Sequence, residues 1–171
     1  MPAIASWHDY FLVVGGGAAA LTGLVFVAMT LHLEEITKDP VHRHRARTIL
    51  TGLTAVFIRC SLALMGGQSG QAIAIELIGV LVVVEVILYS SIRQAAGNAD
   101  RWVLYRTIGS FACLVTEKAG ALVLFFGNTY GLYAVGIGMM SSFIFMVTGA
   151  WLLLVGVGSQ EVASATSGAA D

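Results

Sequence analysis

The amino-acid sequence predicts an all-α protein, a membrane helical bundle of about five transmembrane helices. Its 171 residues are 57% hydrophobic and only 11% charged, whereas a soluble domain carries about 25% charged residues. Five apolar stretches are each roughly 20 residues or longer, which is enough to cross a hydrocarbon core of about 30 Å. Most lysines and arginines gather in two of the segments between these stretches, as is typical of loops on one side of a membrane.

The predicted spans follow one another with little chain between them. Turn-type sequences, GGQSG at 66–70 and GNTY at 127–130, join the second span to the third and the fourth to the fifth. They leave no room for a further domain, so residues 1–158 are predicted to form a single transmembrane helical domain. Because Ser, Ala and Gly dominate residues 159–171, we expect a disordered cytoplasmic tail there. The predicted spans are 7–33, 46–65, 71–92, 104–126 and 131–157.

The first span carries rows of small residues that predict a helix-packing seam. Gly15, Ala19 and Gly23 recur every four residues and share one helical face, and Gly16 and Ala20 form a parallel row beside them. Small side chains at this spacing let two backbones approach closely inside lipid. We therefore expect the other membrane helices to pack against this seam.

The distribution of positive charge predicts the orientation of the chain. Cytoplasmic loops carry an excess of Lys and Arg, so the loops after the first and third spans are expected to be cytoplasmic. The N-terminus and the two Gly-rich turns are then outside, the C-terminus is cytoplasmic, and the location is a plasma membrane of the bacterial inner-membrane type. The basic residues in or beside these two loops are Lys38, Arg43, Arg45, Arg47, Arg93, Arg101 and Arg106.

Five ionisable residues fall well within the predicted spans and are the candidate site residues. Charges in a bilayer are costly and usually face a bundle interior, a partner or a water-filled cavity. Three acids against two bases leave one glutamate without a basic partner. That glutamate would be either protonated or exposed to water, and it is the best single argument for transport or proton chemistry. These residues form an intramembrane charge network of Arg59, Glu76, Glu85, Glu117 and Lys118.

Depth along the helices suggests which of these charges meet. Arg59 and Glu76 flank the turn at 66–70 at similar distances, so a hairpin brings them to the same depth. Glu117, near the middle of the fourth span, is the competing partner for Arg59. Glu85 lies about two and a half turns from Glu76 and points the other way, toward a subunit interface or an inner vestibule. An Arg59–Glu76 pair could be structural or functional.

Several function classes find no support in the sequence. The net charge is −1 and no basic surface domain is present, so nucleic acid is not an expected partner. The stretch VHRHRAR at 41–47 is typical of a basic juxtamembrane segment rather than a metal site. No hydrolase, metalloprotease or phosphate-loop motif occurs, so we expect no catalytic residues, no cofactor and no enzyme activity. Cys60 and Cys113 lie in apolar segments and are expected to be packing residues.

Three stretches of the sequence resemble one known group of proteins. They are WHDYFLVVGGGAAALTGLVFVAMTLHLEEI with its following basic loop, ARTILTGL, and GGQSGQAIAIELIG, which together cover roughly the first half of the chain. This part resembles small uncharacterised bacterial integral membrane proteins. The resemblance implies a membrane location and transfers no site residue.

Two functional hypotheses follow. The first is a small oligomeric channel or transporter for protons, ions or small solutes, in which Arg59, Glu76 and Glu117 line or gate the path. The alternative is a non-catalytic accessory or assembly subunit of a larger membrane complex, which packs through Gly15, Ala19 and Gly23. The expected partners are the lipid bilayer and either further copies of the chain or a larger complex.

Overall fold

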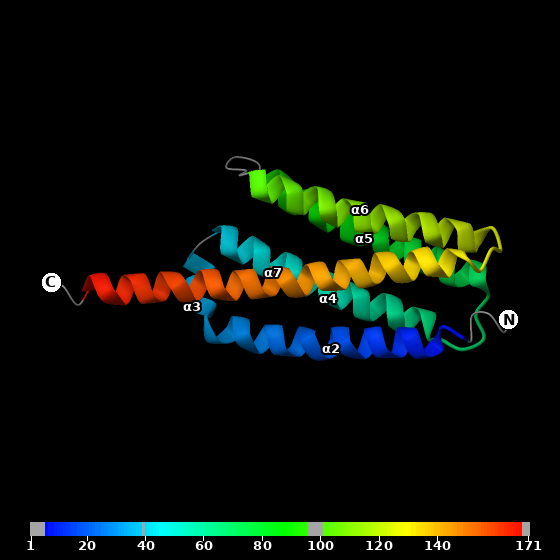
Figure 1. Cartoon of the computed structure of the whole chain (residues 1–171), viewed down its shortest axis with the longest axis horizontal. Helices are drawn as coiled ribbons and strands as arrows, with labels where there is room; N and C mark the ends of the chain where they lie inside the picture. The colour runs from blue at the N-terminus through cyan, green and yellow to red at the C-terminus, as the bar shows by residue number, and fades with distance from the viewer. Residues whose placement is uncertain (1–5, 39, 96–100, 169–171) are drawn as a thin grey trace.

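The computed structural model describes residues 6–38, 40–95 and 101–168, and the predicted all-α architecture is confirmed (Figure 1). Five of its helices are long and apolar enough to cross a membrane, namely those containing His8–Leu31, His42–Ala63, Gly70–Ser90, Ile108–Phe125 and Gly131–Val155. The helices are α2 (His8–Leu31), α3 (Leu33–Lys38), α4 (Pro40–Ala63), α5 (Gly70–Ala95), α6 (Arg101–Phe125) and α7 (Gly131–Gly168).

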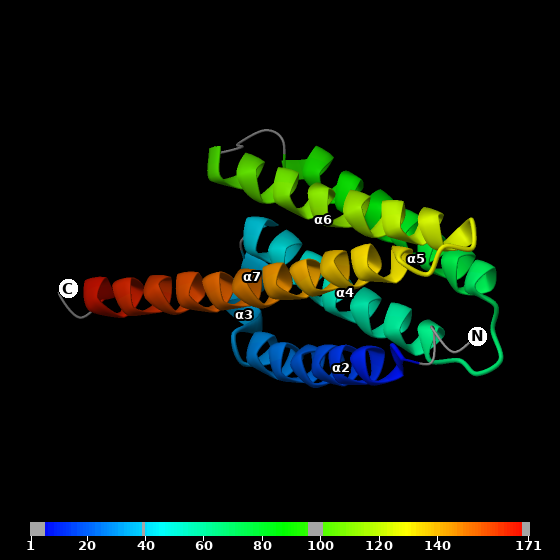
Figure 2. The same ribbon diagram turned by 45° about the vertical axis from the view of Figure 1, so that its right-hand side comes forward.

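The five long helices lie roughly side by side along the long axis of the molecule (Figures 1 and 2). Helix α4 contacts α2, α5 and α7, and α6 packs between α5 and α7. The short helix α3 turns the chain from α2 into α4. We call the end of the bundle with the turns at 64–69 and 126–130 the turn end, and the opposite end, which holds α3, the α3 end.

The turns at the turn end follow known capping chemistry. Gly127 has φ +86°, and its N–H donates to the Leu124 carbonyl while the Asn128 N–H donates to the Val123 carbonyl. This double hydrogen bond at a left-handed glycine is the Schellman termination of a helix, here of α6. At the start of α5, the Ser69 hydroxyl accepts the Ala72 N–H at 3.2 Å, which is an N-cap.

Two clusters of buried side chains form the core, one at each end. The turn-end cluster includes Phe11, Cys60, Leu77, Leu124 and Met139 and so joins all five long helices. The α3-end cluster is drawn from α2, α3, α4 and α7 and consists of Val25, Met29, Ile36, Ala46, Ile49, Leu53, Ala150 and Leu153. The α5–α6 pair lies close to α4 and α7 at the turn end and diverges from them toward the α3 end (Figures 1 and 2).

Helix α7 is longer than the sequence predicts. It continues to Gly168 and extends past the other helices (Figure 1), so residues 159–168 are helical where the sequence predicts a disordered tail. Adding a residue to an existing helix costs far less than nucleating one, and Ala163 and Ala165 have high helix propensity. Residues 169–171 lie outside the described residues.

The small-residue seam predicted on α2 does not pack inside the bundle as expected. A Cβ on Gly15 would meet the Cys60 Cβ at 2.8 Å, so Gly15 does lie against α4. By contrast, a Cβ added to Gly16 or to Gly23 would meet no atom of another helix within 4 Å, and Ala19 and Ala20 are exposed. The reason is that α2 buries another face at helical spacing, consisting of Phe11, Val14, Ala18, Val25 and Met29.

The closest helix contact lies instead between α6 and α7. A Cβ on Gly120 would meet the Val135 N at 2.6 Å and the Gly131 carbonyl oxygen at 2.7 Å. A Cβ on Gly138 would meet the Glu117 Cβ at 2.9 Å and the Cys113 carbonyl oxygen at 3.0 Å. Glycine at these positions lets the two backbones touch, and this contact sets the position of Glu117.

Candidate functional site

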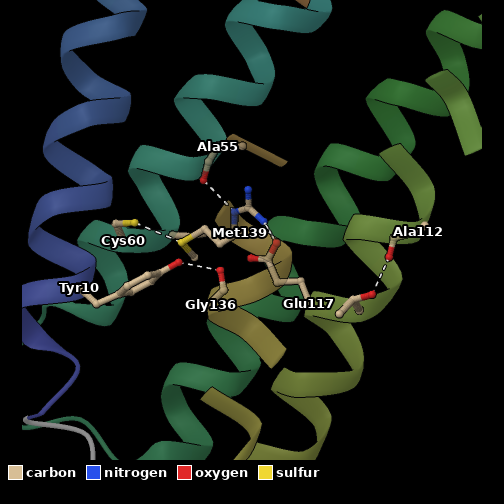
Figure 3. Close-up of polar contacts among 9 residues, drawn as sticks. Tyr10, Ala55, Cys60, Ala112, Glu117, Gly136 and Met139 are labelled. Atoms are coloured by element: carbon tan, nitrogen blue, oxygen red, sulfur yellow. Dashed lines mark hydrogen bonds and ion pairs between the residues drawn. The ribbon is translucent and has the colours of Figure 1, made fainter. Parts of the chain in front are cut away.

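The centre of the bundle holds a buried ion pair between Arg59 on α4 and Glu117 on α6. Only 1% of Arg59 and 0% of Glu117 is exposed. Arg59 Nη1 donates to Glu117 Oε2, and Arg59 Nε donates to the Ala55 carbonyl oxygen at 3.0 Å. Figure 3 shows the Glu117 carboxylate and the Ala55 carbonyl in the space between the helices.

Arg59 and Glu117 lie at different distances from the ends of their helices, and the length of the Arg59 side chain lets them meet. Arg59 lies roughly 6 Å from the C-terminal end of α4, and Glu117 roughly 12 Å from the C-terminal end of α6, at about 1.5 Å per residue. Both of these helix ends are at the turn end. Helical side chains lean toward the N-terminus of their own helix, so the long Arg59 side chain reaches the depth of Glu117.

The predicted Arg59–Glu76 pair is therefore wrong, and the competing partner Glu117 is the one that Arg59 contacts. The Glu76 carboxylate instead accepts two hydrogen bonds from Gln68 Nε2, at 2.8 and 2.9 Å. Equal depth along the two helices does not make Arg59 and Glu76 meet, because the rotation of α5 also matters. This helix buries the face of Ala74, Leu77 and Leu81, and Glu76 lies beside that face. The sequence does not by itself identify Gln68 as the partner of Glu76. The available signal was its polar amide, which lies in a short turn eight residues before Glu76.

The other two intramembrane charges form a second ion pair. Lys118 Nζ donates to Glu85 Oε2, and these side chains are 29% and 24% exposed. Glu85 thus lies apart from Arg59, as its helical position predicts. Glu76 is the glutamate left without a basic partner among the described residues.

Polar and sulfur contacts surround the Arg59–Glu117 pair on the side of the turn end. The Tyr10 hydroxyl donates to the Gly136 carbonyl oxygen at 2.6 Å, and Cys60 Sγ lies 3.3 Å from Met139 Sδ (Figure 3). Cys60 and Met139 are fully buried members of the turn-end cluster. Packed side chains therefore lie on the turn-end side of the pair.

On the side of the α3 end, a pocket lies between α4, α5, α6 and α7. Arg59 is among its lining residues, and its cavity volume is about 40 Å³. A cavity of roughly 10–15 Å³ holds one water, so a few waters fit. Its walls are mostly apolar, and its hydroxyl groups come from Thr48, Thr51, Ser110 and Ser142.

One oxygen of the Glu117 carboxylate is not used in the ion pair. Glu117 Oε1 is buried, and among the described residues it has no hydrogen-bond partner. A carboxylate oxygen in this state can accept a proton or a hydrogen bond. Glu117 itself is not among the residues that line the pocket. The described residues contain no group of three or more His, Cys, Asp and Glu that could hold a metal ion.

Comparison of this chain with protein-family models, curated proteins and solved structures finds no match.

Proposed function

We propose that this chain is a small proton-coupled membrane transporter and that Arg59 and Glu117 form its coupling site. One observation carries the proposal: a pocket on the α3 side of the buried ion pair reaches Arg59, while packed side chains fill the turn-end side of the pair. A site that is accessible from one side at a time is what alternating access requires. The proposal includes no enzyme activity.

The divergence of the α5–α6 pair suggests which part moves. At the α3 end, the packed cluster holds α2, α3, α4 and α7 together, and the pocket separates this group from α5 and α6. Rocking of α5 and α6 against α4 and α7 would close the pocket at the α3 end and loosen the packing at the turn end. Arg59 lies on α4 and Glu117 on α6, so this movement would shift one charge relative to the other.

The apolar walls suit a small solute with an apolar body, and Arg59 suits an anionic group on it. Charge balance then couples solute to proton, because a net charge in a low-dielectric interior is costly. Arg59 and Glu117 together are neutral. When an anionic group binds Arg59, neutrality returns only if Glu117 takes up one proton, for which the unpartnered Oε1 is available.

The proposed orientation follows from the basic residues near the α3 end. Lys38, Arg43 and Arg47 are exposed there, and the positive-inside rule makes that side cytoplasmic. The pocket would then open toward the cytoplasm of a bacterial-type plasma membrane, with the N-terminus outside and the C-terminus inside.

Proton entry into vesicles that contain the purified protein and a pH-sensitive dye tests this function. A panel of small apolar carboxylates is added outside, and protein-free vesicles give the background from passive permeation. Wild-type protein should raise proton entry above that background for some of these solutes. Glu117→Gln, which cannot exchange a proton, should lose the effect, and Glu76→Gln should keep it because Glu76 is bonded to Gln68 away from Arg59.

Glu117→Gln leaves Arg59 without a carboxylate, so folding needs its own control. The double variant Arg59→Leu with Glu117→Leu removes both charges, and we expect it to fold without proton-coupled flux. Wild-type flux in Glu117→Gln, or no flux above background in the wild type with any solute, would contradict the proposed function.

One observation supports the alternative function, an accessory subunit of a larger membrane complex. Gly16, Ala19, Ala20 and Gly23 form an exposed row of small residues on α2, and such rows favour close helix contacts in lipid. Co-purification with a different membrane protein that is lost in Gly23→Leu would support this role.

A further inference from the structure

An ion pair between α5 and α6 is partly exposed on the outside of the bundle. The side chains of Lys118 and Glu85 are 29% and 24% exposed, whereas those of Arg59 and Glu117 are 2% and 0% exposed. Lys118 lies near the middle of the span Ile108–Phe125, about 10 Å from its Phe125 end at roughly 1.5 Å per residue. In a solitary bundle this pair would contact the hydrocarbon of the bilayer.

Lipid contact is an unfavourable setting for these charges. Ionisable side chains within spans almost always face a bundle interior, water or a partner. The pocket lies between α4, α5, α6 and α7 and does not include either residue in its lining. Something other than lipid is therefore expected to cover Lys118 and Glu85.

The residues around the pair form a continuous apolar face. On α5, Val82 and Tyr89 lie three and four positions from Glu85, and on α6, Val115 and Leu122 lie three and four positions from Lys118, so each shares a face with its charge. Their exposed fractions are between 45% and 61%. We call this surface the α5–α6 patch: Val82, Glu85, Tyr89, Val115, Lys118 and Leu122.

We infer that a second copy of this chain packs on the α5–α6 patch around a two-fold axis along the membrane normal. A two-fold interface uses the same surface on both copies and must be self-complementary. The patch meets this condition, because it has one positive and one negative group at similar depth. Rotation places Lys118 opposite the Glu85 of the partner subunit, and the four charges leave the lipid together while the apolar residues pack.

This inference does not depend on the proposed transport. The solute pocket lies within each bundle on the inner side of α5 and α6, and the patch lies on their outer side. Two copies joined through the patch would each retain a complete pocket. The interface also gives the α5–α6 pair a fixed neighbour against which the rest of each bundle can move.

Counting copies in a bilayer tests the inference. Chains labelled once at the C-terminus are reconstituted at falling protein-to-lipid ratios, and photobleaching steps per spot are counted. The wild type should show two copies. The double variant Glu85→Leu with Lys118→Leu leaves no unpaired charge and should associate at least tenfold more weakly, whereas the exchange Glu85→Lys with Lys118→Glu should associate as the wild type does.

The matched control removes an ion pair outside the spans. Lys38 Nζ lies 2.9 Å from Glu34 Oε1, with side chains 67% and 77% exposed, and the adjacent Lys38 holds the pKa of Glu34 below its usual value. The double variant Glu34→Leu with Lys38→Leu should leave the association unchanged. A wild type that stays single at every ratio, or a Glu85/Lys118 double variant that associates normally, would overturn the inference.

A second measurement tests the interface by cysteine cross-linking. With Cys60 and Cys113 replaced by alanine, Leu122→Cys should form a cross-linked dimer in the bilayer, because Leu122 belongs to the patch. Leu24→Cys is the control, since Leu24 is 66% exposed on α2. Cross-linking through Leu24 but not through Leu122 would overturn the inference and point to the α2 face.

Discussion

Arg59 is the largest side chain that the described part of the bundle buries almost completely. Its guanidinium contacts one carboxylate oxygen and one backbone carbonyl, and Glu117 keeps its second oxygen without a partner among the described residues. A buried ion pair is weak evidence for stability, because desolvation can exceed the attraction between the charges. The proposed coupling of solute and proton needs both charges.

Single glycines control how closely the helices approach this pair. In Gly120→Ala, the new Cβ would meet backbone atoms of α7 at 2.6 and 2.7 Å, so we expect a loss of about 1–3 kcal/mol in the free energy of unfolding. Gly23→Ala is the matched control, because its Cβ would enter open space. It should be neutral or stabilise by up to about 1 kcal/mol. Unfolding in detergent, followed by circular dichroism, measures both.

Equal stability of Gly120→Ala and Gly23→Ala would show that α6 and α7 do not touch as described. Both substitutions gain helix propensity, so the difference between them isolates the contact. The same comparison tests the correction to the predicted α2 seam.

At the scale of helices, the sequence predicts the spans well because length and composition decide whether a helix can cross a bilayer. It does not predict which face turns inward. Two rows at helical spacing compete on α2, and the row that includes Phe11 and Val14 is buried because these larger side chains fill the space against α4 and α7. Similarly, depth alone could not choose between Glu76 and Glu117, because the choice depends on how each helix is rotated.

The divergence between the α5–α6 pair and α4 leads to a prediction about the pocket. Thr51 lines the pocket from α4, so Thr51→Trp should fill much of it and abolish solute-dependent proton entry into vesicles. Phe57→Trp is the control on the same helix, because Phe57 is 42% exposed on the outside. Melting temperatures of the purified variants should stay near that of the wild type. Full flux with Thr51→Trp would mean that the solute path lies elsewhere.

At the scale of the whole molecule, the pocket lies on the α3 side of the ion pair and packed side chains lie on its turn-end side, and the exposed basic residues Lys38, Arg43 and Arg47 lie near the α3 end. This asymmetry gives the proposed transport its direction. Reporters fused after Lys38 and after Asn98 should read cytoplasmic, and a reporter at Ser69 should read external, because the positive-inside rule places the basic loops in the cytoplasm. The opposite readings would reverse the direction in which the pocket opens.

The central claim is that Arg59 and Glu117 form one coupled pair, and a double-mutant cycle in the free energy of unfolding tests it most directly. Arg59→Leu alone and Glu117→Leu alone should each cost about 3–5 kcal/mol, because each leaves a buried unpaired charge. The double variant should cost clearly less than the sum. As a control, Arg59→Leu and Glu76→Leu should add to within about 0.5 kcal/mol, as independent sites do. Strict additivity for Arg59 and Glu117, or coupling between Arg59 and Glu76 instead, would contradict the account.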